Sequence, residues 1–135
     1  MAKIDAAKVW SLNYRLLSTV LVAVAPQLDD LGLEAKELFM LGAIEEHPNP
    51  AALADALCMP KPTVTVYLKR LESVSFVRRE IDPSDLRRHR LNLTAAGRKI
   101  LAQGQSLLSE AFALRLARLS NAEQVQLTAL LEKLG

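Results

Sequence analysis

The chain has 135 residues, a length that fits one domain with its own core. Half of the residues are apolar and 24% are charged, which excludes a disordered chain. The single cysteine, Cys58, excludes an internal disulfide and suits a reducing cytoplasm. Residues 1–10 lack the apolar core of a signal peptide, and the most apolar run, Val20 to Pro26, is far shorter than the ~20 residues that span a bilayer. We therefore expect a soluble, cytoplasmic protein.

The formal net charge is only +2, but the positive charge is concentrated in the middle of the chain. Residues 61–90 carry eight Lys and Arg against four Asp and Glu, whereas the other residues carry nine against eleven. This distribution fits a face that meets a polyanion. On charge alone, a solvated basic face without any partner is an equally good interpretation.

Hydrophobic periodicity predicts two helices at the start of the chain. Apolar residues recur every three or four positions over residues 6–28, and Pro26 with the Leu-Asp-Asp-Leu-Gly stretch after it is expected to end this helix. A second helix is expected over about residues 34–46, ending before His47-Pro48.

Two shorter helices are expected next. Asn49 can cap a helix and Pro50 suits the first helical position, so residues 51–58 should form a short helix. A further start at Lys61-Pro62 predicts a helix to about residue 73 or 74. Strand-like segments at Phe76–Ile81 and His89–Leu93 then flank a turn at residues 82–84. Two short helices with a hairpin behind them are typical of a winged helix-turn-helix.

Long helices are expected at the C-terminal end as well. Thr94 should cap a helix over about residues 95–118, and a Ser-x-x-Glu capping box at residues 120–123 should open the last helix. The predicted fold class is therefore mainly α with a small β-hairpin.

The helix expected over residues 61–73 has two chemically different faces. Val64, Leu68 and Leu71, flanked by Tyr67, form a stripe that should face a core. The outward side and its shoulders carry hydroxyls, cations and one small apolar side chain, namely Pro62, Thr63, Thr65, Val66, Lys69, Arg70 and Ser73. Hydroxyls and cations suit phosphates and base edges, and an apolar surface suits the thymine methyl group. A solvated amphipathic helix is the alternative.

The hairpin continues this basic patch. An Asp-x-Arg arrangement, Asp85 and Arg87, follows its turn. An Arg at a hairpin tip can enter a narrow minor groove, where the negative potential is greatest. Asp85 could hold the Arg87 guanidinium in place through a charge-assisted pair.

Residues 53–97, LADALCMPKPTVTVYLKRLESVSFVRREIDPSDLRRHRLNLTAAG, resemble the winged-helix domain of the MarR family of bacterial transcriptional regulators. The matching elements are LA-x-x-L, T-V-T…L-x-x-L-E, F-V-R-R, D-x-R and L-T-x-x-G, in the family's order and spacing. The flanking long helices match the family's dimerisation helices, so the resemblance covers nearly the whole chain.

The resemblance implies a single MarR-like domain over residues 1–135, with dimerisation helices at 1–30 and 95–135 and a DNA-binding lobe at 34–94. It implies a homodimeric repressor of a palindromic double-stranded DNA site, with half-sites about one helical turn apart. Carried over by position, the DNA-binding residues are Thr63, Thr65, Val66, Lys69, Arg70, Asp85, Arg87, Arg88 and Arg90, with Arg87 in the minor groove. A small-molecule effector site is implied between the helices and the lobe, lined by Trp10, Asn13, Tyr14, Leu17 and Phe39. Core packing explains those five residues equally well.

Three residues depart from the family pattern. Ser75 stands where Gly is usual, and a left-handed backbone there would cost about 1 kcal/mol. Val66 replaces a residue that is often polar, which favours apolar base contacts. Leu86 replaces a frequent Arg within D-x-R, which removes one cation from the wing.

The remaining candidates for chemistry are weak. Cys58 lies outside the first helix, where the family's peroxide sensors carry their cysteine, so we expect a small packing residue. Together with His47 and His89 it is too isolated to form a metal site. No motif for catalysis or for a cofactor is present. The alternative function from another class is a winged-helix protein-interaction module without DNA binding, and an enzyme comes third.

Overall fold

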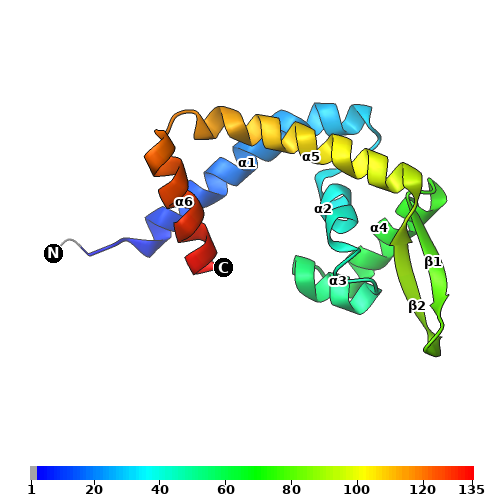
Figure 1. The fold of residues 1–135 in the computed structure, drawn as a ribbon. Helices are drawn as coiled ribbons and strands as arrows, with labels where there is room; N and C mark the ends of the chain where they lie inside the picture. The colour runs from blue at the N-terminus through cyan, green and yellow to red at the C-terminus, as the bar shows by residue number, and fades with distance from the viewer. Residues whose placement is uncertain (1–2) are drawn as a thin grey trace. The chain divides into compact units, whose positions relative to one another are not determined.

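The computed structural model describes residues 3–135 and contains, over those residues, six α-helices and one two-stranded antiparallel sheet (Figure 1). The elements in chain order are α1 (Ala6–Asp30), α2 (Ala35–Ala43), α3 (Pro50–Leu57), α4 (Lys61–Ser73), β1 (Val77–Asp82), β2 (Asp85–Leu93), α5 (Ala95–Leu116) and α6 (Asn121–Leu134). The predicted fold class, mainly α with a small hairpin, is confirmed.

The chain divides into two compact units. The lobe comprises Ala25–Gln105, and the helical unit comprises the chain up to Val24 together with Ser106–Gly135. The long helices α1 and α5 each contribute residues to both units. The predicted assignment of residues 1–30 and 95–135 to dimerisation and of residues 34–94 to DNA binding stays a prediction.

Several element boundaries differ from those predicted. Helix α1 ends at Asp30, two residues beyond the predicted end at residue 28 and within the Leu-Asp-Asp-Leu-Gly stretch. Leu28, two residues past Pro26, is 1% exposed, and burying that side chain offsets the backbone hydrogen bond that proline cannot donate. Helix α2 ends at Ala43, earlier than predicted, and β2 begins at Asp85 because the turn is only two residues long.

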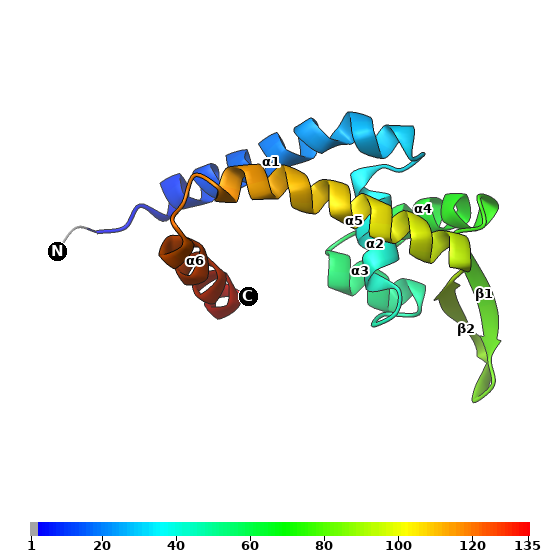
Figure 2. The same ribbon diagram turned by 45° about the horizontal axis from the view of Figure 1, so that its top comes forward.

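The core of the lobe is formed by α2, α3, α4 and the base of the hairpin. Its fully buried side chains include Leu38, Leu41, Ile44, Leu53, Val64, Leu68, Leu71 and Leu91. The predicted core stripe of α4 is thereby confirmed. The hairpin extends from the lobe as an arm in both views (Figure 1, Figure 2).

Side-chain caps fix the helix starts as predicted. Asn49 Oδ1 accepts a hydrogen bond from the Ala52 amide at 2.8 Å, which opens α3. Thr94 Oγ1 accepts from the Gly97 amide at 2.9 Å and donates to the Ser75 carbonyl at 2.6 Å, so one hydroxyl joins the start of α5 to the end of α4. The capping box of Ser120 and Glu123 is complete in α6, with both bonds formed.

Ser75 adopts the left-handed backbone conformation that its position suggested, with φ of 62°. A side chain is strained in this region, whereas glycine is not. We expect Ser75→Gly to raise the free energy of unfolding by up to about 1 kcal/mol in urea denaturation. Ser73→Gly, within α4, is the matched control and should lower it. A lower free energy of unfolding in Ser75→Gly would show that the left-handed backbone at Ser75 is not strained.

Within residues 3–135, no single helix is both long and apolar enough to cross a membrane. Only α1 and α2 taken together as a bent pair meet those criteria, by length and composition.

Candidate nucleic-acid interface

Helix α4 presents the predicted outward face. Thr65, Val66 and Lys69 are exposed, and the Val66 side chain is 66% exposed although it is apolar. Thr63 is half-buried. The Thr65 hydroxyl donates to the Lys61 carbonyl at 3.0 Å, which leaves its oxygen free to accept and its methyl group on the surface. This face combines an acceptor, a cation and apolar surface, as a major-groove helix requires.

Arg70 lies on the shoulder of that face but is bound by groups of the protein itself. Its guanidinium forms an ion pair with the Glu37 carboxylate and donates to the Gly32 carbonyl at 2.6 Å. The predicted DNA contact at this position therefore competes with two intramolecular partners. Helical spacing placed Arg70 on the shoulder of the outward face, but it could not reveal the acceptors on a neighbouring helix.

The tip of the hairpin is irregular. Asp82, the last residue of β1, pairs with Asp85, whereas the residue before it, Ile81, pairs with His89. Three residues of β2 between these partners, Leu86, Arg87 and Arg88, therefore have no cross-strand partner. A bulge of this kind turns side chains away from the regular pleat. Leu86 is 79% exposed as a result, and Arg87 is exposed beside it.

Asp85 supports the tip in a different way from the one predicted. Its Oδ1 accepts from the Arg87 backbone amide at 3.0 Å, and its Oδ2 lies 3.6 Å from Arg88 Nε. The expected pair with the Arg87 guanidinium is absent from the described residues, because the bulge places the amide of Arg87 rather than its side chain against Asp85. Asp85 therefore orients the backbone of the tip and leaves the Arg87 guanidinium free.

The turn before the tip is held by Asp82. The Ser84 hydroxyl and the Ser84 amide both donate to Asp82 Oδ1, at 2.7 Å and 2.9 Å. These hydrogen bonds, with a smaller contribution from the charges of Arg90 and Arg88, hold the pKa of the Asp82 carboxyl below its usual value. At neutral pH the ionised carboxylate of Asp82 therefore stabilises the turn by accepting both hydrogen bonds from Ser84.

The eight cations of residues 61–90 separate into two groups. Four form intramolecular ion pairs: Arg70 with Glu37, Arg78 with Glu80, Arg79 with Glu72, and Arg88 with Asp85. The other four, Lys61, Lys69, Arg87 and Arg90, form no ion pair among residues 3–135. The free cations lie on α4 and on the hairpin. Lys61, at the first position of α4, was not among the predicted site residues, although its place at a helix start was visible in the sequence.

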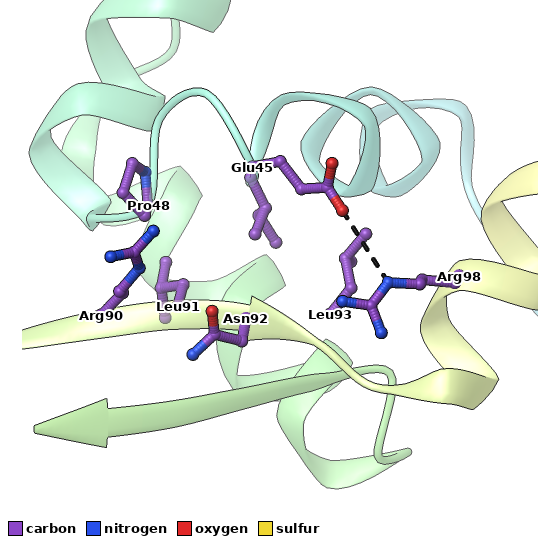
Figure 3. Close-up of a pocket in the computed structure, with 8 residues that line it drawn as sticks. Glu45, Pro48, Arg90, Leu91, Asn92, Leu93 and Arg98 are labelled. Atoms are coloured by element: carbon purple, nitrogen blue, oxygen red, sulfur yellow. Dashed lines mark ion pairs between the residues drawn. The ribbon is translucent and has the colours of Figure 1, made fainter.

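A cavity of about 270 Å³ opens beside the hairpin within the lobe (Figure 3). Ile44, Leu91 and Leu93 line it together with Pro48, and Arg90, Asn92, Glu45 and Arg98 provide its polar groups. Arg98 Nε lies 3.9 Å from Glu45 Oε1, an ion pair drawn as a dashed line in Figure 3. The Leu91 amide donates to the Pro48 carbonyl at 2.7 Å, which fixes the base of β2 to the loop before α3.

The other candidate residues lie as follows. Trp10, Asn13, Tyr14 and Leu17 are exposed on α1 in the helical unit, and Phe39 is half-buried on α2 in the lobe. Their grouping into one ligand site stays a prediction.

Cys58 is exposed and ends α3 with φ of 53°, so the expectation of a packing residue is wrong. Among residues 3–135, no group of three or more His, Cys, Asp or Glu could hold a metal ion.

A helical lobe with an outward-facing helix followed by a basic hairpin defines a winged helix-turn-helix protein. A family model described as "MarR family" matches residues 33–89. The chain is 30% identical to the HTH-type transcriptional repressor Rv2887 of Mycobacterium tuberculosis over 137 aligned residues, covering 100% of this chain and 99% of that protein. The chain belongs to the MarR family, and the resemblance predicted from residues 53–97 is confirmed.

Two further comparisons agree with this assignment. The transcriptional regulator HosA of Escherichia coli O111:H- is 37% identical over 97 residues, which cover 70% of this chain and 72% of that protein. A crystal structure of Rv2887 in complex with salicylic acid superimposes with a TM-score of 0.79 at 28% identity, covering 98% of each chain. The protein is therefore a DNA-binding transcriptional regulator in its class of function.

Proposed function

We propose that the protein represses transcription as a cytoplasmic homodimer that binds a palindromic operator, and that it catalyses no reaction. The observation that carries the proposal is the separation of the cations. Among residues 3–135, Lys61 and Lys69 on α4 and Arg87 and Arg90 on the hairpin are free of intramolecular ion pairs, whereas four neighbouring arginines each form one. Free cations on these two elements are suited to the phosphates and grooves of one duplex.

Within this proposal the residues have distinct roles. Thr63, Thr65 and Val66 contact base edges in the major groove, and Lys61 and Lys69 contact phosphates. Arg87 enters the minor groove from the bulged tip, which the Asp85 carboxylate orients through the Arg87 amide. Arg88 and Arg90 contact phosphates on the flank of the site.

A small-molecule effector releases the protein from DNA. The support is the salicylic acid bound by the related repressor Rv2887. The candidate lining residues are Trp10, Asn13, Tyr14, Leu17 and Phe39, of which Trp10 and Tyr14 are stacked with ring centroids 6.5 Å apart. An effector acts only if it binds one conformation of the dimer more tightly than the DNA-binding conformation.

Arg87→Ala is expected to weaken operator binding by at least about 1 kcal/mol while leaving dimerisation intact, because the tip loses its only unpaired cation. Fluorescence anisotropy with the operator duplex measures the loss. Arg88→Ala removes the same charge from a paired residue and is the matched control, with a smaller effect. Equal losses in the two variants would show that the tip contributes charge alone.

Isolation of genomic DNA bound by the protein distinguishes the proposed function from a protein-interaction module. Enrichment of a discrete palindromic site supports the repressor. The module predicts that no DNA is enriched. Repeating the experiment with salicylic acid tests release by a small aromatic acid.

A further inference from the structure

Glu37 is the one charged side chain that is fully buried among residues 3–135. It lies in the first turn of α2, where the N-terminus of the helix favours a negative charge. Removing an ionised carboxylate from water costs several kcal/mol unless partners replace the lost hydration. The carboxylate is therefore stable here only because other groups of the lobe satisfy it.

Both oxygens of this carboxylate have partners. Glu37 Oε1 accepts from the Glu34 amide at 2.9 Å, and Oε2 is bound by the guanidinium of Arg70. The second terminal nitrogen of Arg70 donates to the Gly32 carbonyl at 2.6 Å, in the turn between α1 and α2. One arginine of α4 is thus joined both to α2 and to the segment before it.

A second contact, between Tyr67 and Glu34, joins α4 to the start of α2. The Tyr67 hydroxyl donates to Glu34 Oε2 at 2.8 Å, and this hydrogen bond raises the pKa of Tyr67 above its usual value. Tyr67 and Arg70 are three residues apart on α4, and Glu34, the N-cap residue of α2, is three residues from Glu37 in the first turn of that helix. Residues at this spacing lie on one side of a helix. Two such contacts restrict both the rotation of α4 about its axis and its sliding along α2.

Small rotations of α4 matter for base recognition. On a helical wheel Arg70 lies about 40° from Val66, close to the proposed DNA-facing side. Side chains extend roughly 5–6 Å from a helix axis, so a rotation of about 10° displaces their ends by on the order of 1 Å. Hydrogen bonds to base edges tolerate less than this displacement. Contacts to phosphates depend on net charge and are less sensitive to it.

We propose that Arg70 is a positioning residue of the recognition helix. Together with Tyr67 it fixes α4 on the carboxylates of Glu34 and Glu37 in the orientation that reads the operator, and it does not contact DNA. This assignment rests on the proposed function, since it concerns binding to an operator. It replaces the phosphate or base contact implied for Arg70 by the family resemblance.

Glu37→Gln separates the two roles by the sign of its effect. The substitution keeps the shape of the side chain and removes the charge that holds the guanidinium. If Arg70 positions α4, operator affinity should fall by about tenfold or more, while affinity for an unrelated duplex of equal length stays unchanged. If Arg70 instead contacts a phosphate, Glu37→Gln releases the guanidinium and removes a negative charge. Both affinities should then rise, which would overturn the proposal.

Arg70→Lys and Lys69→Ala complete the experiment. Arg70→Lys preserves charge but cannot bridge Glu37 and Gly32 in the same planar geometry, so operator affinity should fall while the slope of log affinity against log salt stays constant. Lys69→Ala, the neighbouring free cation, should weaken binding to both duplexes and reduce that slope by about one. Retention of wild-type operator affinity in Arg70→Lys would also overturn the positioning role.

Two checks establish that a loss of affinity does not come from misfolding: circular dichroism of each variant at the titration temperature, and the milder variant Tyr67→Phe. Tyr67→Phe removes only the parallel hydrogen bond, leaves no buried charge unpaired, and should reduce the ratio of operator affinity to nonspecific affinity severalfold. If Tyr67→Phe kept the wild-type ratio of operator affinity to nonspecific affinity, the contact between Tyr67 and Glu34 would have no part in positioning α4. If the wild-type protein itself shows no preference for any operator, the proposed function fails. If wild type and Lys69→Ala behave as expected but Glu37→Gln does not, only the positioning role fails.

Discussion

Replacing Gly97 with alanine should lower the free energy of unfolding by up to about 2 kcal/mol. A Cβ atom on Gly97 would lie 2.0 Å from the carbonyl oxygen of Phe76, and the opposing group is backbone that cannot rotate away. The same carbonyl accepts a hydrogen bond from the Thr94 amide at 3.1 Å, so a shift of α5 would strain the junction of β1, β2 and α5. Overpacking of this kind costs about 1–3 kcal/mol and occasionally more, which outweighs the roughly 1 kcal/mol gained from alanine in a helix.

Gly42→Ala is the matched control for this measurement. Gly42 lies within α2, where the nearest atoms to an added Cβ are 3.6 Å and 3.8 Å away, an ordinary contact distance. Urea denaturation should therefore show Gly42→Ala at or above wild-type stability and Gly97→Ala well below it. Equal stability of the two variants would mean that α5 moves away from Phe76 without cost. The glycine of the L-T-x-x-G motif would then have no packing role.

Features encoded by neighbouring residues could be predicted from the sequence. The caps at Asn49 and Thr94 and the capping box at residues 120–123 depend on side chains that reach only a few residues along the chain. The core stripe of α4 follows from helical spacing, and its members Val64, Leu68 and Leu71 are fully buried. These signals were sufficient for the fold class and for the core-facing side of α4.

Features that depend on tertiary partners could not be predicted. Whether a cation is free or neutralised depends on which carboxylate lies opposite, and Arg70 meets Glu37, 33 residues away. The role of Asp85 changed because the register of the hairpin skips three residues at its tip. The free cations Lys61 and Arg87 could therefore be distinguished from their neighbours only in the structure.

Helix α6 carries the strongest indication of a missing partner. It contains seven apolar residues among fourteen, yet none of its residues is buried. Leu127, Leu130, Leu131 and Leu134 recur at intervals of three and four, and the last three are at least half exposed. Short helices are marginal in water without packing. A second copy of this chain is the occupant that the proposed homodimer provides, since a two-fold interface places the same stripe on both subunits.

Leu131→Glu is expected to convert the dimer into a monomer and to reduce operator affinity by about 100-fold or more. Burying one leucine contributes about 1.5–3 kcal/mol, and symmetry removes two of them in the variant, before the cost of placing two carboxylates in an apolar interface. A monomer binds one half-site and loses the gain of about 10²–10⁴ that comes from linking two binding modules. Analytical ultracentrifugation measures the first effect and anisotropy with the full operator the second.

Ala129→Glu is the control, because it adds the same charge to α6 at an exposed position about 100° or more around the helix from every leucine of the stripe. It should remain dimeric and bind the operator with nearly wild-type affinity. A dimeric Leu131→Glu variant would place the interface elsewhere in the helical unit. A monomeric variant with undiminished operator affinity would contradict the requirement for two recognition helices, because affinity would then come from a single lobe.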